Sequence, residues 1–144
     1  MASDQEKISK VFLDSSVFIA AAISPTGSAR DLIMSFLNNK FKVVVSDLVL
    51  EETEKNLSNK APKALPIFRL FLEILQPEVV RPPKSLVARA TKVLDTKVAP
   101  IVAGAIQSKA DFLASYDRKH LLQKRKEIKR HFDITVTTPD EIIK

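Results

Sequence analysis

Short apolar runs alternate with longer amphipathic stretches along the chain. Such runs lie at 10–14, 41–45, 111–115 and 134–136, with a further short one at 78–81. Polar or turn-forming residues bound them, which is typical of buried strands. Strands that are apolar along their length and alternate with helices indicate a parallel sheet covered on both faces. The pattern therefore predicts an α/β fold: a three-layer α/β/α sandwich with a central parallel sheet of about four to five strands.

Helical patterns fill the segments between these runs. One predicted helix starts between Pro62 and Pro66, ends near Leu75 and is apolar on two flanks. It is therefore either buried on two sides or part of a contact between subunits, and we expect a homodimer. No internal repeat or domain boundary is visible, so residues 1–144 are expected to form a single domain. The other helices are expected at 15–23, 28–37, 47–57, 85–94, 98–109 and 118–130, with a closing helical turn at 139–143.

Composition excludes several classes of protein. The chain has no cysteine and only 2 glycines. This excludes a disulfide framework, thiolate zinc sites, a cysteine nucleophile and a glycine-rich phosphate loop. The apolar stretch 17–23 is too short to span a bilayer, and the N-terminus is polar and mixed in charge. We therefore expect a cytoplasmic protein without a membrane partner.

The charge balance is strongly basic. Lys and Arg number 23 against 17 Asp and Glu, which gives a net charge of +6. Such a balance favours anionic partners, above all nucleic acid, although a basic domain that binds no anion remains the alternative. Much of the charge falls in the predicted helix 118–130. The candidate nucleic-acid-binding residues there are Arg118, Lys119, Lys124, Arg125 and Lys126. A solvated helix face is the other interpretation of this charge run.

Acidic side chains follow three of the predicted strands. Asp14 comes directly after the first strand, Glu51 and Glu52 lie about one turn into the helix behind the second, and Asp117 follows the strand at 111–115. The carboxyl ends of parallel strands form the edge where open α/β sheets bind ligands. Converging carboxylates repel one another unless a cation neutralises them, and oxygen ligands suit Mg²⁺ or Mn²⁺. A pair of such ions can activate water for phosphodiester hydrolysis.

Each of these acids could instead have a purely structural role. Asp14 and Asp117 could cap the helices that follow them, and Glu51 or Glu52 could be an ordinary surface acid. Only one of the two glutamates is expected to face the sheet edge. The joint placement of acids at three strand ends favours a site over these separate roles. Hydroxyl groups that can support such a site come from Ser15, Ser16 and Ser115.

Four segments of the chain resemble a known family. They are FLDSSVFIAAAISPTGSARDLI, VVVSDLVLEETEKNL, APIVAGAIQSKADFLASYDRKHLL and ITVTTPDEII. These segments are similar to the PIN-domain nucleases, in particular to the small toxin components of toxin–antitoxin pairs. The resemblance implies an α/β/α sandwich, often dimeric, that cleaves single-stranded RNA with Mg²⁺ or Mn²⁺ and pairs with an antitoxin. It also implies that Asp14, Glu52 and Asp117 are the catalytic acids and metal ligands.

One position departs from the pattern of that family. The family usually has an acid directly before an Ala-Pro-Ile helix start, and this chain has Val98 there. A carboxylate at a helix N-terminus is favoured by the helix dipole, whereas valine has neither charge nor lone pair. Asp95 is a candidate replacement as a catalytic acid, although Pro100 places it outside the helix. The chain could therefore be a slower nuclease, a one-metal nuclease, or an RNA- or protein-binding module that does not cleave.

Two further features narrow the alternatives. A phospho-receiver domain ranks below these possibilities, because it needs a second acid after the first strand, where this chain has serines. His120 and His131 are isolated in the sequence, and no nucleophilic triad can be assembled around either.

Overall fold

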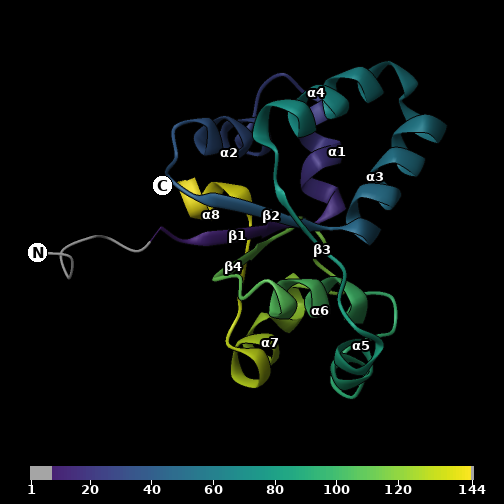
Figure 1. The fold of residues 1–144 in the computed structure, drawn as a ribbon, viewed down its shortest axis with the longest axis vertical. Coiled ribbons are helices and arrows are strands. Elements are labelled where there is room, and N and C mark those ends of the chain that lie inside the picture. The colour runs from purple at the N-terminus through teal and green to yellow at the C-terminus, as the bar shows by residue number, and fades with distance from the viewer. Residues whose placement is uncertain (1–7, 144) are drawn as a thin grey trace, which may run out of the picture.

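The computed structural model describes residues 8–143, and a five-stranded parallel sheet lies at its centre (Figure 1). The strands are β1 (Lys10–Leu13), β2 (Lys42–Ser46), β3 (Glu78–Val80), β4 (Phe112–Ala114) and β5 (Thr135–Thr137). Their order across the sheet is β3-β2-β1-β4-β5, so β1 is central and pairs with both β2 and β4. Every apolar run that the sequence pattern assigns to a strand forms one.

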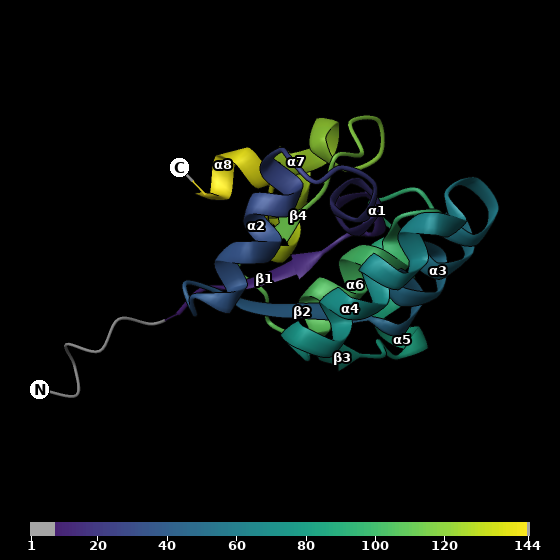
Figure 2. The same cartoon turned by 90° about the horizontal axis from the view of Figure 1, so that it is seen from above.

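Helices cover both faces of the sheet, which confirms the three-layer sandwich (Figures 1 and 2). One face carries α1 (Ser15–Ile23), α2 (Ser28–Leu37), α3 (Asp47–Lys60), α4 (Leu65–Leu75) and α8 (Pro139–Ile143). The other carries α5 (Lys84–Thr91), α6 (Ala99–Gln107) and α7 (Arg125–Phe132). Single 3₁₀ turns, η2 and η3, occupy Pro62–Ala64 and Leu122–Lys124. No helix within residues 8–143 combines the length and apolar character needed to cross a bilayer.

The route of the chain creates a crevice beside β1. The connections from β1 to β2 and from β2 to β3 run over the α1 face, while those from β3 to β4 and from β4 to β5 run over the α6 face. The chain therefore builds the sheet outward in both directions from the boundary between β1 and β4. In doubly wound sheets, ligands bind at the carboxyl ends of the strands at such a boundary.

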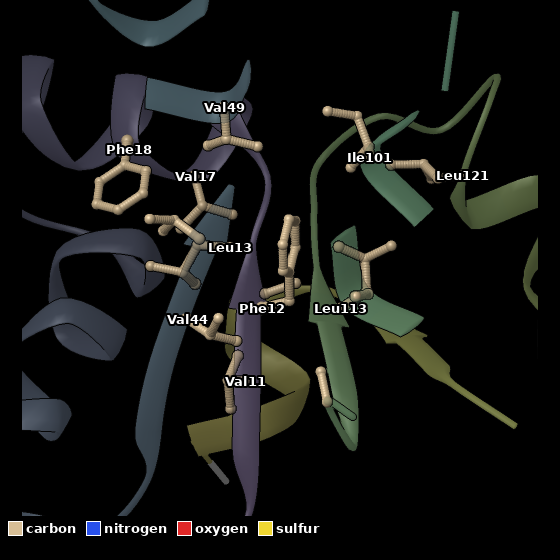
Figure 3. Close-up of a cluster of buried hydrophobic side chains, with 14 of the residues drawn as sticks. Val11, Phe12, Leu13, Val17, Phe18, Val44, Val49, Ile101, Leu113 and Leu121 are labelled. Atoms are coloured by element: carbon tan, nitrogen blue, oxygen red, sulfur yellow. The ribbon is translucent and has the colours of Figure 1, made fainter. Parts of the chain in front are cut away.

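The central strand is completely buried after its first residue. Val11, Phe12 and Leu13 have no exposed surface, because helices pack on both sides of them. Their side chains alternate between the two faces, with Leu13 near Val17 of α1 and Phe12 on the opposite side (Figure 3). A Cβ atom placed on Gly104 of α6 would lie 2.9 Å from the Phe12 ring, so α6 approaches β1 as closely as only a glycine allows.

The predicted single helix over 118–130 is wrong. Residues 118–121 form a turn, η3 follows, and α7 begins only at Arg125. The backbone carbonyl of Asp117 accepts the amides of Leu121 at 3.2 Å and Leu122 at 2.9 Å, which closes the turn. Leu121 is 1% exposed and packs into the core. The chain thus folds back over the sheet before the basic helix starts, so that helix does not begin at Asp117.

Candidate active site

A cavity of about 380 Å³ opens at the carboxyl ends of β1 and β4, at the crevice just described. Its walls come from the β1–α1 turn, α3, the connection between α5 and α6, α6 itself, and the segment after β4. The lining residues are Asp14, Ser15, Ser16, Glu52, Lys97, Val98, Ile101, Asp117, Lys119 and His120. Three acids separated by up to 103 positions therefore surround one cavity.

Asp14 occupies the floor of this cavity. It directly follows β1, is 7% exposed, and its amide donates to the carbonyl of Ala114 on β4 at 3.1 Å. Although Asp14 is the N-cap residue of α1, its side chain makes no capping hydrogen bond. Instead, its Oδ2 atom accepts hydrogen bonds from the hydroxyls of Ser16 at 2.8 Å and Ser115 at 2.7 Å. The Asp14 carboxylate therefore does not cap α1, although the sequence allowed that role.

The two serine hydroxyls connect the ends of β1 and β4. Ser16 Oγ accepts the amide of Tyr116 at 3.0 Å, and Ser115 Oγ accepts the amide of Asp117 at 2.9 Å. Each hydroxyl therefore donates to Asp14 and accepts from the backbone that leads to Asp117. This arrangement uses both capacities of each hydroxyl and couples the position of one acid to that of the other.

Asp117 is held by a residue that the sequence did not single out. The backbone amide of His120 donates to Asp117 Oδ1 at 3.0 Å, and His120 Nδ1 lies 3.3 Å from each carboxylate oxygen. The His120 ring is 20% exposed and lines the cavity. The only sequence signal for this contact is the spacing of three residues after a strand-end aspartate. His120, isolated in the sequence, thus lies beside Asp117 in the structure.

Two carboxylates in the cavity have a raised pKa, which means that their ionised forms are disfavoured. Burial raises the pKa of Asp14 most strongly, the hydroxyls of Ser115 and Ser16 lower it in part, and the charge of Asp117 raises it further. The pKa of Glu52 is also raised, first by partial burial and then by the charge of Asp14, while Lys97 acts in the opposite direction. Asp14 is thus close enough to both Asp117 and Glu52 for their negative charges to repel.

The connection between α5 and α6 supplies the wall at Val98. This side chain is 4% exposed and offers no ligand atom. Asp95 is exposed and does not line the cavity. Its Oδ1 atom accepts the amide of Lys97 at 2.8 Å, and its backbone carbonyl accepts the amides of Val98 and Ala99. Asp95 therefore organises the turn that leads into α6, and its contacts turn it away from the cavity.

The remaining strand-end polar residues have structural partners. Ser46 caps α3 by accepting the amide of Val49 at 3.3 Å, and Asp47 pairs with Arg81 at 2.8 Å. Glu52 lines the cavity and Glu51 does not, as expected for neighbouring residues on a helix. At the opposite end of the sheet, an Asp111 carboxylate oxygen accepts the amide of Lys10 at 2.8 Å.

The basic residues fall into two groups. Lys119 lines the acidic cavity, and Arg118 is its neighbour in the chain. Lys124 closes η3, while Arg125 and Lys126 begin α7. The latter two line a separate groove of about 470 Å³ between α7 and the edge strand β5. Its other lining residues are Lys129, Arg130, Thr135 and Val136.

The donor set of the cavity suits a divalent cation that keeps much of its own hydration. Carboxylate oxygens are the ligands that Mg²⁺ and Mn²⁺ prefer, and the mutual repulsion of the acids is relieved by a cation. Within residues 8–143, no three His, Asp or Glu side chains form a ready metal-binding cluster. Mg²⁺ commonly takes one or two carboxylates, with water or substrate phosphate completing its shell. The residues present fit a cation held in this way.

Comparisons with known proteins agree with this architecture. A family model described as the PIN domain matches residues 10–119, a range that contains all three cavity acids. The structure of VapBC2 from Rickettsia felis, bound to a DNA fragment from the promoter, superposes with a TM-score of 0.66 at 16% identity, covering 90% of this chain and 98% of that one. PAE2754 from Pyrobaculum aerophilum superposes with a TM-score of 0.62 at 17% identity, covering 94% and 93%. No curated protein sequence matches significantly.

Proposed function

The chain belongs to the PIN-domain family, and from this premise we propose that it is a metal-dependent endoribonuclease acting on single-stranded RNA. PIN domains are generally nucleases. The observation that carries the proposal is the convergence of Asp14, Glu52 and Asp117 on one cavity that Lys97 and Lys119 also line. Carboxylates can hold a divalent cation there, and ammonium groups can contact the anionic backbone of the RNA.

In this proposal, Asp14, Asp117 and Glu52 hold Mg²⁺ or Mn²⁺. Hydrolysis joins a water oxygen to phosphorus and releases the bridging oxygen, which takes up a proton. When bound, the cation supplies an activated water and stabilises the charge on the leaving oxygen. Ser16 and Ser115 fix the orientation of Asp14, because both hydroxyls donate to the same carboxylate oxygen. That leaves its other oxygen available to a ligand.

A cleavage assay tests this function. Labelled single-stranded RNA is incubated with the purified protein in Mn²⁺, in Mg²⁺, or in excess chelator. We expect cleavage only with a cation, and loss of cleavage in Asp14→Asn. Asp31→Asn is a matched control, since Asp31 is an exposed acid in the first turn of α2 and does not line the cavity. Cleavage by Asp14→Asn at the wild-type rate would falsify the assignment.

A second candidate function is an RNA-binding module that does not cleave. Two observations favour it: Val98 offers no ligand atom, and Asp95 is committed to the turn before α6. Val98→Asp distinguishes the two functions. If the native chain binds RNA without cutting it, and Val98→Asp gains cation-dependent cleavage, then the missing carboxylate is the reason for inactivity.

The basic residues outside the cavity support RNA binding along a longer track. We assign Arg118 and Lys119 to the RNA segment beside the cavity, and Lys124, Arg125 and Lys126 to contacts farther along the strand. Arg125 is partly occupied by Glu141, at 3.4 Å. Substituting Lys126 by Ala should weaken binding about equally for all RNA sequences, because phosphate contacts carry no base information. Fluorescence anisotropy with two unrelated oligoribonucleotides measures this.

We also propose two protein partners. The first is a second copy of the chain, which would cover the groove of about 350 Å³ between α2 and α4. Apolar residues around this groove are half exposed, including Met34 at 49%, Leu70 at 50% and Ile74 at 50%. The second partner is an antitoxin, suggested by the likeness to a VapBC2 structure. Expression of the chain alone should then arrest growth, and co-expression of its antitoxin should restore it.

A further inference from the structure

The cavity has a lysine next to the position where the family pattern has an acid. Lys97 and Val98 are adjacent residues of the connection between α5 and α6, and both line the cavity. Val98 takes the position of the usual acid, so this wall contributes an ammonium group and no carboxylate. The charge of Lys97 reaches Glu52 across the cavity, as its lowering effect on the pKa of that carboxyl indicates.

The backbone of the turn fixes where Lys97 lies. Its amide donates to Asp95 Oδ1 at 2.8 Å, while Val98 and Ala99 donate to the Asp95 carbonyl at 3.1 and 3.0 Å. Lys97 is thus held on a closed turn that is anchored by the buried Val98. Within residues 8–143 no ion pair joins its ammonium group to a carboxylate within 4.0 Å, so the group is available to a ligand.

A phosphodiester anion is repelled by a cavity lined only with carboxylates, and attracted by one that also contains lysines. In a cavity lined only by carboxylates, the anion is repelled until a divalent cation is present. Here Lys97 and Lys119 line the same cavity as the three acids. Two ammonium groups offset most of that repulsion without any cation, and each can donate up to three hydrogen bonds to phosphate oxygens.

We propose that Lys97 binds a phosphate group of single-stranded RNA in this cavity, so that the substrate binds before and independently of the divalent cation. The proposal rests on the ribonuclease function proposed above. It assigns substrate binding and cleavage to different residues. Lys97 and Lys119 provide substrate binding, and the acids with their cation provide cleavage. Lys97 is thereby a substrate-binding residue, which the resemblance to the family does not assign.

Anisotropy titrations of a labelled oligoribonucleotide in excess chelator test the proposal. The wild-type protein is expected to bind RNA without cation, and Lys97→Ala to bind about tenfold more weakly, a typical effect of one lost charged contact. The slope of log Kd against log salt concentration should fall by about 0.7, as for one phosphate contact to a single strand. Lys97→Arg should retain most of the affinity. The control is Lys92→Ala, an exposed lysine at the end of α5.

Cleavage kinetics in Mn²⁺ separate this proposal from the proposed function. We expect Lys97→Ala to raise KM more than it lowers kcat, with Lys92→Ala unchanged. Equal RNA affinity of Lys97→Ala and wild type would overturn the role of Lys97 while leaving the nuclease function intact. Wild-type RNA binding that requires Mn²⁺ would overturn cation-independent binding. Absence of both binding and cleavage in every condition would overturn the proposed function itself.

Discussion

At the scale of single residues, the carboxylate of Asp14 is held where its charge is disfavoured. The side chain is 7% exposed, and burial raises its pKa despite two serine hydroxyl donors. A residue in such a place reduces stability when ionised, because the folded state solvates the charge less well than water does. The repulsion from Asp117 adds to this effect. The cation proposed for this cavity would offset both penalties.

The pKa shift of Asp14 leads to a pH dependence of stability. Because the folded pKa lies above the ordinary value of 3.8, the unfolded chain loses this proton first as pH rises. The contribution of Asp14 to the free energy of unfolding is therefore fully favourable below pH 3.8 and falls as pH rises toward the folded pKa. We expect Asp14→Asn to gain stability relative to wild type between pH 4 and pH 7, in chelator. Urea unfolding at each pH measures the difference.

Glu141 contributes to stability in the opposite direction in that experiment. Hydrogen bonds from the amide and hydroxyl of Thr138 lower the pKa of Glu141 to about 2, so its stabilising contribution is lost as pH falls below 4.5. Wild type and Asp14→Asn share this effect, and their difference cancels it. A difference that stays constant or shrinks between pH 4 and pH 7 would contradict the predicted direction.

Ser115 gives a second prediction at this scale. Its hydroxyl is completely buried, donates to Asp14 and accepts from the amide of Asp117. Ser115→Ala leaves that partly buried amide without its partner, and the Asp14 carboxylate without one donor, and should lower the free energy of unfolding by about 1–3 kcal/mol. Cleavage should fall about 10–100-fold, as for the loss of a residue that orients a metal ligand. The control is Ser108→Ala, since Ser108 is 3% exposed and its hydroxyl bonds only to a helix carbonyl.

At the scale of secondary-structure elements, the contact between α6 and β1 positions the site. Val98, at the start of α6, lines the cavity, and Gly104 in the same helix lies against Phe12 of β1. Asp14 directly follows that strand, two residues after Phe12. The distance between α6 and the strand end that carries Asp14 is therefore set by a residue without a side chain.

Gly104→Ala should disturb this contact. The added Cβ atom would lie 2.9 Å from Phe12 Cε2 and 3.3 Å from Ser46 Cβ, which is closer than packed carbons tolerate. The gain in helix propensity is about 1 kcal/mol, and overpacking costs about 1–3 kcal/mol, so we expect a net loss of stability with reduced cleavage. Thermal unfolding measures the loss. Phe12→Leu in the same chain should restore part of it, and Gln107→Ala on the same helix should change little.

Sequence reasoning predicts the strands better than the segment after β4. Buried parallel strands are apolar throughout, so β1, β2, β4 and β5 stand out as runs between polar residues. In the segment 118–130, Leu121 and Ile128 are seven residues apart and fit one helical face. The sequence cannot show that Leu121 instead enters the core beside a turn closed by Asp117. Tertiary packing overrides helical periodicity at this point.

Only part of the acidic cavity can likewise be predicted from the sequence. Asp14 and Asp117 are predictable because the strand-end rule fixes their edge of the sheet. The contact of His120 with Asp117 and the placement of Lys97 on the cavity wall depend on the geometry of two turns. Turn geometry depends on local hydrogen bonds that a residue pattern does not specify. These residues therefore emerge only from the structure.

At the scale of the whole molecule, the groove between α2 and α4 predicts the oligomeric state. Leu70 and Ile74 are each 50% exposed on α4 and border this groove. If a second copy covers it, replacing both with glutamate should convert a dimer to a monomer, because burying two unpaired charges is unfavourable. Light scattering after size-exclusion chromatography measures the mass. Ile23→Glu serves as the control, since Ile23 is 54% exposed and does not line the groove. A wild-type monomer would rule out the dimer.

The hydrogen bond between Ser115 and Asp14 joins residues 101 positions apart. During translation, Asp14 leaves the ribosome long before Ser115 and Asp117. The two aspartates can therefore come together only after β4 has been synthesised and has paired with β1. Pairing across such a separation is entropically costly and late. A nascent or prematurely terminated chain that lacks β4 consequently lacks Asp117 and cannot form the proposed cleavage site. If the proposed nuclease function holds, the cell is exposed to cleavage only after β4 and Asp117 have been synthesised.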